Sequence, residues 1–164
     1  MADLSAARLR TLAAELRREV QLIQRSVAEL QWVADQPSSE AAQRIQLYAA
    51  AAMLDTFYTG VERALERIAR TFQSLPDGPN WHRALLDESA LDVPRVRPAV
   101  LRSSTAHEMG RYLGFRHRFR NLYLFDLDGA QMRPLVDGAG AASEAACADL
   151  GNFADQLDAL ADAL

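Results

Sequence analysis

The segment from Leu4 to about Asp35 contains neither glycine nor proline, the residues that most often interrupt a helix. Its large apolar residues recur at steps of three and four positions. They are Leu9, Leu12, Leu16, Val20, Ile23, Val27 and Leu30. This spacing forms one apolar stripe along a helix, and another element has to cover such a stripe. The segment therefore predicts a long amphipathic helix in a helical protein.

A second long helix is expected directly after the first. The residues Gln36-Pro37-Ser38-Ser39 end the first helix, and Ser38 or Ser39 is suited to cap a helix that runs to about Phe72. The apolar residues of this second helix are Ile45, Tyr48, Ala49, Ala52, Phe57, Val61, Leu65 and Ile68. Two helices of similar length joined by a short break form an antiparallel hairpin, the elementary unit of a bundle.

The middle of the chain alternates between turn residues and short apolar runs. Turn residues fill 74–80 (SLPDGPN), a short helix is expected from 81 to 86, and the prolines of 92–98 indicate a connector. A Ser-Ser-Thr run followed by Glu108 resembles a capping box, which predicts a third long helix over about 103–123.

The last part of the chain predicts further helices. The FDLDG segment (125–129) turns the chain, and a short helix is expected over 131–136. The glycine-containing DGAGAAS segment (137–143) is a candidate interruption before a final helix over 144–164. This final helix is expected to expose its acidic residues, Asp149 among them.

The composition agrees with an all-α fold. Of the 164 residues 49% are hydrophobic, and there are only eight glycines and six prolines, which argues against disorder and against an all-β protein. A chain of this length is expected to form one domain, here residues 1–164. We predict an up-and-down bundle of four long helices with one or two short ones.

All 18 basic residues of the chain are arginines, because the sequence contains no lysine. Chemistry that depends on a lysine, such as a Schiff base or a Walker-type phosphate site, is therefore excluded. The net charge of −4 hides an asymmetry: residues 95–133 hold eight arginines and three acidic residues, whereas 137–164 hold six acidic residues and no base. A polyanionic partner is thus compatible with the acidic total.

The single cysteine, the histidine spacing and the lack of a targeting pattern lead us to expect a cytoplasmic protein without a metal ion or cofactor. The single cysteine, Cys147, lies among small residues and is expected to be a buried apolar side chain. The chain shows no signal-peptide pattern and no run of 18 apolar residues, so no membrane association is expected. His82 is expected to pack or cap near a turn, and His107 to be exposed; the three histidines lack the spacing of paired metal ligands.

The most unusual window is 111–123 (RYLGFRHRFRNLY), which holds four arginines and no acidic residue. On a helical wheel Tyr112, Phe115, Phe119 and Leu122 form a buried stripe. Beside it lie Arg116, Arg120 and Tyr123, with His117 about 60° beyond Arg120. A bound phosphate would relieve the repulsion among these arginines. The alternative is structural, in which the arginines favour the helix C-terminus or pair with Asp126, Asp128 or the acidic last helix.

Several segments together resemble one family. These are YTGVERALERIAR, WHRALL, VRPAV and FRHRFRNLY, which lie between about Tyr48 and Leu135. They resemble the HepT-like branch of the HEPN superfamily, while the first helix fits less specifically. The resemblance implies a small helical bundle that forms a homodimer, and a ribonuclease toxin that cleaves RNA without a metal ion. It also implies a minimal nucleotidyltransferase as antitoxin partner.

The family motif is Arg, four residues, His, one residue, Tyr. On this chain Arg116 and Tyr123 occupy the Arg and Tyr positions, whereas Asn121 occupies the His position. Asparagine cannot exchange a proton near neutral pH. His117 can supply the imidazole, since it follows Arg111 at the looser HEPN spacing of four to six intervening residues. The resemblance further implies that Tyr123 accepts a nucleotide and that an acidic residue, here Glu62, orients the motif arginine.

The sequence therefore predicts a HEPN-type endoribonuclease toxin with a composite cleft at the dimer interface. Its catalytic residues would be Arg116, His117, Arg120 and Tyr123; the RNA-binding residues would be Arg111, Arg118 and Asn121, with Glu62 in support. Asn121 favours the first alternative, a catalytically inactive HEPN fold that binds RNA or another protein. The second alternative is a purely structural helical subunit whose arginines only pair with neighbouring acidic residues. For Glu62 the alternative role is an ordinary buried Arg–Glu pair.

Overall fold

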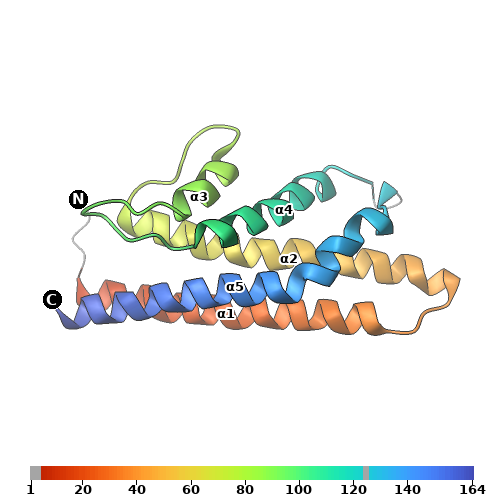
Figure 1. Ribbon diagram of the computed structural model, residues 1–164, viewed down its shortest axis with the longest axis horizontal. Coiled ribbons are helices and arrows are strands. Elements are labelled where there is room, and N and C mark those ends of the chain that lie inside the picture. Colours follow the sequence, from red (N-terminus) through yellow and green to blue (C-terminus); the bar gives the residue numbers. More distant parts are fainter. Residues whose placement is uncertain (1–4, 124–125) are drawn as a thin grey trace.

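A computed structural model describes residues 5–123 and 126–164 of the chain. The described residues form five helices, which are α1 (Ala6–Asp35), α2 (Glu40–Phe72), α3 (Trp81–Ser89), α4 (Ser103–Phe119) and α5 (Gly129–Asp162). Helices α1, α2, α4 and α5 alternate in direction along the bundle, and the short α3 lies beside α4 (Figure 1). Within the described residues the only β-type pairing is an isolated bridge between Val93 and Arg97. The predicted all-α bundle of four long helices and a short one is confirmed.

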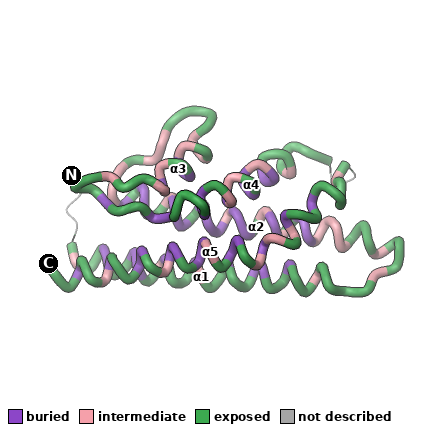
Figure 2. The backbone as a smooth tube through the Cα atoms, viewed as in Figure 1, coloured by how far each residue is buried: buried purple, intermediate pink, exposed green. Residues whose placement is uncertain are grey.

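The α1–α2 hairpin forms as predicted. The Ser5 hydroxyl caps α1 by accepting from the Arg8 amide, and the Ser39 hydroxyl caps α2 by accepting from the Ala42 amide. Leu4, where the first helix was predicted to start, lies outside the described residues. Most residues of the predicted α1 stripe are buried, as the colouring of the tube in Figure 2 indicates, and α1 packs against α2 and α5.

A glycine allows α1 and α2 to approach each other closely. A Cβ atom added at Gly60 would lie 2.7 Å from Cγ1 of Ile23, a distance that real Cβ contacts do not show. Ile45, predicted on the apolar stripe of α2, is instead 71% exposed. Ile45 lines an open surface hollow together with Trp32 and Val33 near the end of α1, so its side chain lies at the surface of the hairpin and not inside the bundle.

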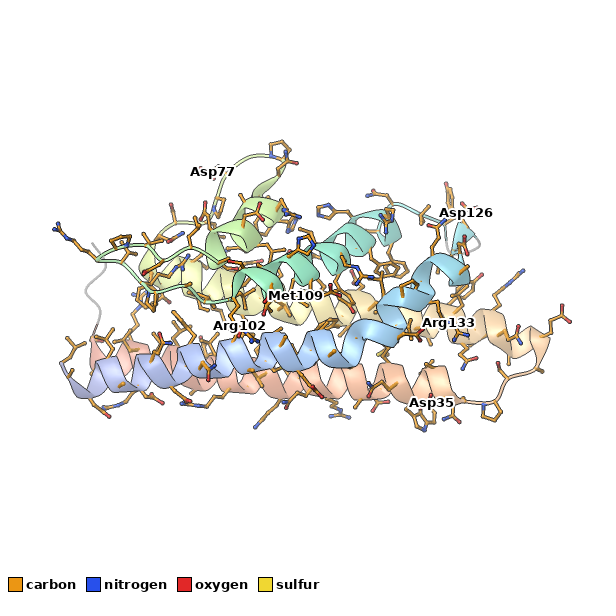
Figure 3. The ribbon with its side chains drawn as sticks, viewed as in Figure 1. Asp35, Asp77, Arg102, Met109, Asp126 and Arg133 are labelled. Carbon is orange, nitrogen blue, oxygen red and sulfur yellow. The ribbon has the colours of Figure 1, made fainter. Side chains whose placement is uncertain are left out.

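Helix α4 differs from the prediction at both ends. It ends at Phe119 rather than near Tyr123, and Leu122, which was predicted on its buried stripe, is 44% exposed. At its start the predicted capping box does not form, because the N-cap residue is Arg102 and no side chain caps it. Arg102 lies at the start of α4 above α5 (Figure 3), where its backbone amide and its Nε donate to the Asp149 carboxylate over 2.9 and 2.7 Å. Asp149 is therefore buried, not exposed as predicted.

Helix α5 is continuous where the sequence predicted a short helix, an interruption and a final helix. It bends in its N-terminal part (Figure 1), where Pro134 removes one backbone hydrogen bond. The glycines of the predicted interruption lie inside the bundle: a Cβ at Gly140 would lie 2.7 Å from Nε2 of Gln31, so that side chain would have to move, whereas one at Gly138 would make an ordinary contact of 3.5 Å with the Tyr112 hydroxyl. Packing thus overrides the low helix propensity of glycine.

The buried apolar side chains form one cluster to which α1, α2, α4 and α5 contribute most. Cys147 belongs to this cluster, as predicted, and burial raises the pKa of its thiol. None of the helices in the described part of the chain has the length and apolar character needed to cross a membrane.

Two isoleucines in the hairpin allow a matched test of this packing. Ile23 is 1% exposed and Ile45 is 71% exposed. We expect Ile23→Ala to lower the free energy of unfolding by about 2–5 kcal/mol, because it leaves a cavity between α1 and α2. Ile45→Ala should change it by no more than about 0.5 kcal/mol. Urea unfolding followed by circular dichroism measures both, and equal losses would contradict the arrangement of the hairpin.

Candidate functional site

The arginine of the family motif position is buried in the bundle. Arg116 is 4% exposed, and its Nη1 lies 2.6 Å from both carboxylate oxygens of Glu62. Its Nε lies 3.6 Å from Oδ1 of Asp55. Asp55 and Glu62 are two turns apart on α2, so both carboxylates lie on the face of α2 that packs against α4. The arginine and the two carboxylates therefore join α2 to α4 inside the protein.

His82 on α3 contacts the same carboxylate. Its Nδ1 lies 2.7 Å from Oε2 of Glu62, and because a carboxylate only accepts, Nδ1 carries the proton. The ring also stacks on its neighbour Trp81 with 3.7 Å between the ring centroids. The His82 side chain is 23% exposed, so one part of the ring is held inside and another part reaches the surface.

His117 lies next to His82 on the surface. The two ring centroids are 5.5 Å apart and the rings meet edge to face. Partial burial lowers the pKa of His117, and the neighbouring His82 and Arg116 lower it further. The pKa of His117 therefore lies below the ordinary histidine value of about 6.5, and the neutral ring predominates at pH 7.

The other arginines of the window are exposed to different degrees and lie on different sides of α4. The Nε of Arg120, just after α4, lies 3.4 Å from Oδ1 of Asp55, and the Arg120 side chain is 53% exposed. Arg111 pairs with Glu108 over 2.8 Å, and Arg118 is exposed. At about 100° per residue, Arg111 and Arg118 lie on the side of the helix opposite Arg116.

The window without acidic residues in the sequence is thus close to acidic residues in space. Sequence analysis considered Asp126, Asp128 and the last helix as possible partners, but the carboxylates that pair with Arg116 and Arg120 belong to α2. The two carboxylates balance the two guanidinium groups, so the histidines lie beside a cluster whose charges already cancel.

Asn121 and Tyr123 lie beyond the end of α4. The Asn121 amide donates to the backbone carbonyl of His117 over 2.8 Å, which satisfies one of the last free carbonyls of the helix. Tyr123 is 72% exposed, and its backbone carbonyl accepts from the Asp126 amide. Two residues of the motif therefore lie on an irregular segment and not on the helical face that the sequence predicted.

The structure brings together four of the predicted residues, namely Glu62, Arg116, His117 and Arg120. Sequence analysis missed His82, which it assigned to packing or capping, and Asp55, whose carboxylate lies beside Arg116 and Arg120. The segment WHRALL belongs to the family resemblance, but nothing in the sequence places its histidine against Glu62. This contact depends on how α3 packs on α2, twenty residues earlier in the chain.

Under the arginine lies an aromatic ring that closes the site from inside. The guanidinium carbon of Arg116 is 5.7 Å from the centroid of the Tyr58 ring, a cation–π distance. Burial raises the pKa of Tyr58 far above its ordinary value, so the phenol stays protonated. Residues 5–123 and 126–164 contain no group of three histidine, cysteine or acidic side chains that could hold a metal ion. The imidazoles of His82 and His117, the guanidinium of Arg120 and the carboxylate of Asp55 reach the surface of the site.

The chain matches the model of one known protein family. The family model of HepT-like proteins matches residues 49–157, which include most of α2, all of α3 and α4, and most of α5. The chain belongs to this HepT-like family. The match contains every residue of the site and leaves out α1. No curated protein and no solved structure matched the chain.

The buried pair predicts a large and position-dependent effect on stability. Arg116→Met should lower the free energy of unfolding by about 3–5 kcal/mol, because it leaves the Glu62 carboxylate buried without its cation. Arg118→Met, the same change at an exposed position, should alter it by no more than about 0.5 kcal/mol.

A second substitution separates the charge from the lost packing. Adding Glu62→Gln to Arg116→Met should restore part of the stability, because a neutral amide is less costly to bury than an unpaired carboxylate. Chemical denaturation of the parent, the two single variants and the double variant measures the coupling free energy between Arg116 and Glu62. Additive losses in the double variant would contradict the pair.

Proposed function

We propose that this HepT-like chain is an endoribonuclease toxin that cleaves RNA without a metal ion. The observation that carries the proposal is an exposed imidazole, His117, with a lowered pKa, which lies beside the Arg116–Glu62 cluster in the part of the chain that matches the family. A neutral imidazole at pH 7 is suited to remove a proton from the 2′-hydroxyl of RNA. The oxygen then attacks the adjacent phosphorus, which yields a 2′,3′-cyclic phosphate and a 5′-hydroxyl end.

The two arginines have different roles in this proposal. Arg116 is 4% exposed and both oxygens of Glu62 occupy its Nη1, so its role is to position its neighbours. Arg120 has a half-exposed guanidinium that a phosphate can reach, and its charge would stabilise the negative charge that develops on the phosphate oxygens. Arg120 thus takes the electrostatic role in the reaction, although Arg116 occupies the arginine position of the motif.

The partners remain those that the family resemblance implies. We propose a homodimer that acts on RNA and is inhibited by a minimal nucleotidyltransferase. Tyr123 is the proposed acceptor of a nucleotide, and its 72% exposure makes it accessible to a modifying enzyme. An added nucleotide close to Arg120 would compete with RNA for the same surface, because both carry phosphate.

A second candidate is a HEPN fold that binds RNA but does not cut it. The observation that favours it is Asn121 in the position of the motif histidine, with its amide engaged by the His117 carbonyl. Such a protein would bind RNA with a steep dependence on salt and leave it intact. Asn121→His should then create cleavage activity if only the motif imidazole is lacking.

Two histidines on α4 allow a matched test of the enzyme proposal. We expect His117→Ala to slow cleavage of an RNA oligonucleotide in the presence of EDTA by about 10²- to 10⁴-fold, because the general base is lost. His107→Ala removes an exposed imidazole from the first turn of the same helix and should leave the rate unchanged. Chromatography of the products identifies the 2′,3′-cyclic phosphate end.

The same variants test toxicity in cells. Induced expression of the parent and of His107→Ala should arrest bacterial growth, whereas His117→Ala should not. The proposal is wrong if the purified parent protein leaves RNA intact, or if His117→Ala cleaves it as fast as the parent.

A further inference from the structure

We infer that His82 is the second catalytic imidazole, which donates a proton to the leaving oxygen while His117 accepts one from the attacking hydroxyl. The inference rests on the proposed ribonuclease function and adds to it a residue outside the family motif. It also places both proton-transfer groups in one protomer, because α3 and α4 of the same chain bring the two rings to a centroid distance of 5.5 Å.

Three contacts hold His82 in one orientation. Glu62 accepts the Nδ1 proton over 2.7 Å, Trp81 stacks on one face of the ring, and the ring of His117 meets it edge to face. Because Nδ1 is engaged by the carboxylate, Nε2 is the nitrogen left for proton exchange. An imidazole fixed by a carboxylate in this way is the usual arrangement of a general acid or base in an enzyme.

The buried arginine gives this arrangement its rigidity. Both oxygens of Glu62 lie 2.6 Å from Nη1 of Arg116, so the carboxylate cannot rotate away from His82 without losing the ion pair. Arg116 therefore affects the reaction indirectly: it holds the Glu62 carboxylate in place, and Glu62 orients His82. The pair accounts for a motif arginine that is buried away from any phosphate.

The proposed step balances in protons and bonds. Neutral His117 takes the proton of the 2′-hydroxyl as the 2′-oxygen bonds to phosphorus. The bond between phosphorus and the 5′-oxygen breaks, and protonated His82 gives its Nε2 proton to that oxygen. The products are a cyclic phosphate and a 5′-hydroxyl, and the two imidazoles have exchanged protonation states, which water restores.

Charged groups from three helices face the two rings. His82 faces Glu62 of α2 and His117 of α4, while His117 faces His82, Glu62 and the guanidinium groups of Arg116 and Arg120. The rate of the parent should therefore rise with pH as His117 loses its proton, because the pKa of His117 lies below the ordinary histidine value of about 6.5.

His82→Asn is the variant that tests the acid role with the least disturbance. The Asn side-chain amide can donate to Glu62 as Nδ1–H does, but it cannot exchange a proton. We expect kcat on an all-oxygen RNA oligonucleotide to fall about 10²- to 10⁴-fold, because the proton donor for the leaving oxygen is lost. His107→Asn, the same substitution at an exposed histidine, should behave as the parent.

A substrate with a better leaving group separates catalysis from positioning. An oligonucleotide with sulfur in place of the 5′-bridging oxygen needs no acid, because a thiolate leaves without a proton. His82→Asn should cleave it nearly as fast as the parent, whereas His117→Asn should remain slow. If His82 only supported the fold, both substrates would be cleaved slowly by His82→Asn and its melting temperature would fall.

Mixing the two variants tests whether one protomer is sufficient. Co-expressed His82→Asn and His117→Asn chains should stay inactive as a mixture, because each protomer lacks one imidazole. If each cleft instead combined His82 of one protomer with His117 of the other, one of the two clefts in every mixed dimer would be intact. Because about half of the dimers are mixed, about a quarter of the parent activity would then return. That recovery would overturn the placement of both imidazoles in one protomer.

The outcomes distinguish the inference from the function on which it rests. A parent protein that cleaves neither substrate would overturn the ribonuclease proposal and this inference with it. A parent that cleaves RNA, together with a His82→Asn variant whose kcat on the oxygen substrate is unchanged, would overturn the inference alone. Loss of cleavage on the oxygen substrate with retention on the sulfur substrate is the result expected.

Discussion

The buried ion pair between Arg116 and Glu62 is the interaction on which the rest of the site depends. Removing a guanidinium and a carboxylate from water costs several kcal/mol for each ion, and the short contacts between them offset this cost only while both partners are present. The pair joins α4 to α2, and through the second contact of Glu62 it also fixes α3. Three helices are thereby held at the point where the two imidazoles meet.

This arrangement changes the meaning of the arginine-rich window. In the sequence, four arginines without an acidic neighbour suggest a surface that attracts phosphate. In the structure, Asp55 and Glu62 neutralise the two inner arginines, and Glu108 pairs with a third. Only part of the positive charge is thus available to a ligand. The two histidines therefore indicate the chemistry of the site better than the arginines do. Charge patterns along one helix describe a binding surface poorly when the neighbouring helix carries the opposite charge.

The fold was predictable where the apolar spacing was strong. The α1–α2 hairpin and its serine caps follow from steps of three and four residues and from the Pro37 break, which are local properties of the chain. Helix α5 was predicted in pieces because Pro134 and the two glycines of 137–143 lower its helix propensity. The tertiary structure favours one continuous helix, since its buried face packs against α1, α2 and α4 along its length.

The sequence by itself determined the helical class, the hairpin, the exclusion of lysine chemistry and the family of the chain, because these depend on composition, on periodicity or on short motifs. It also placed Glu62, Arg116 and His117 among the residues of interest. Only the tertiary structure decided that Arg116 is buried, that α4 ends before Asn121 and Tyr123, and that His82 lies against Glu62. Those outcomes depend on the packing of α3 and α4 on α2, and contacts between residues far apart in the chain leave no local pattern in the sequence.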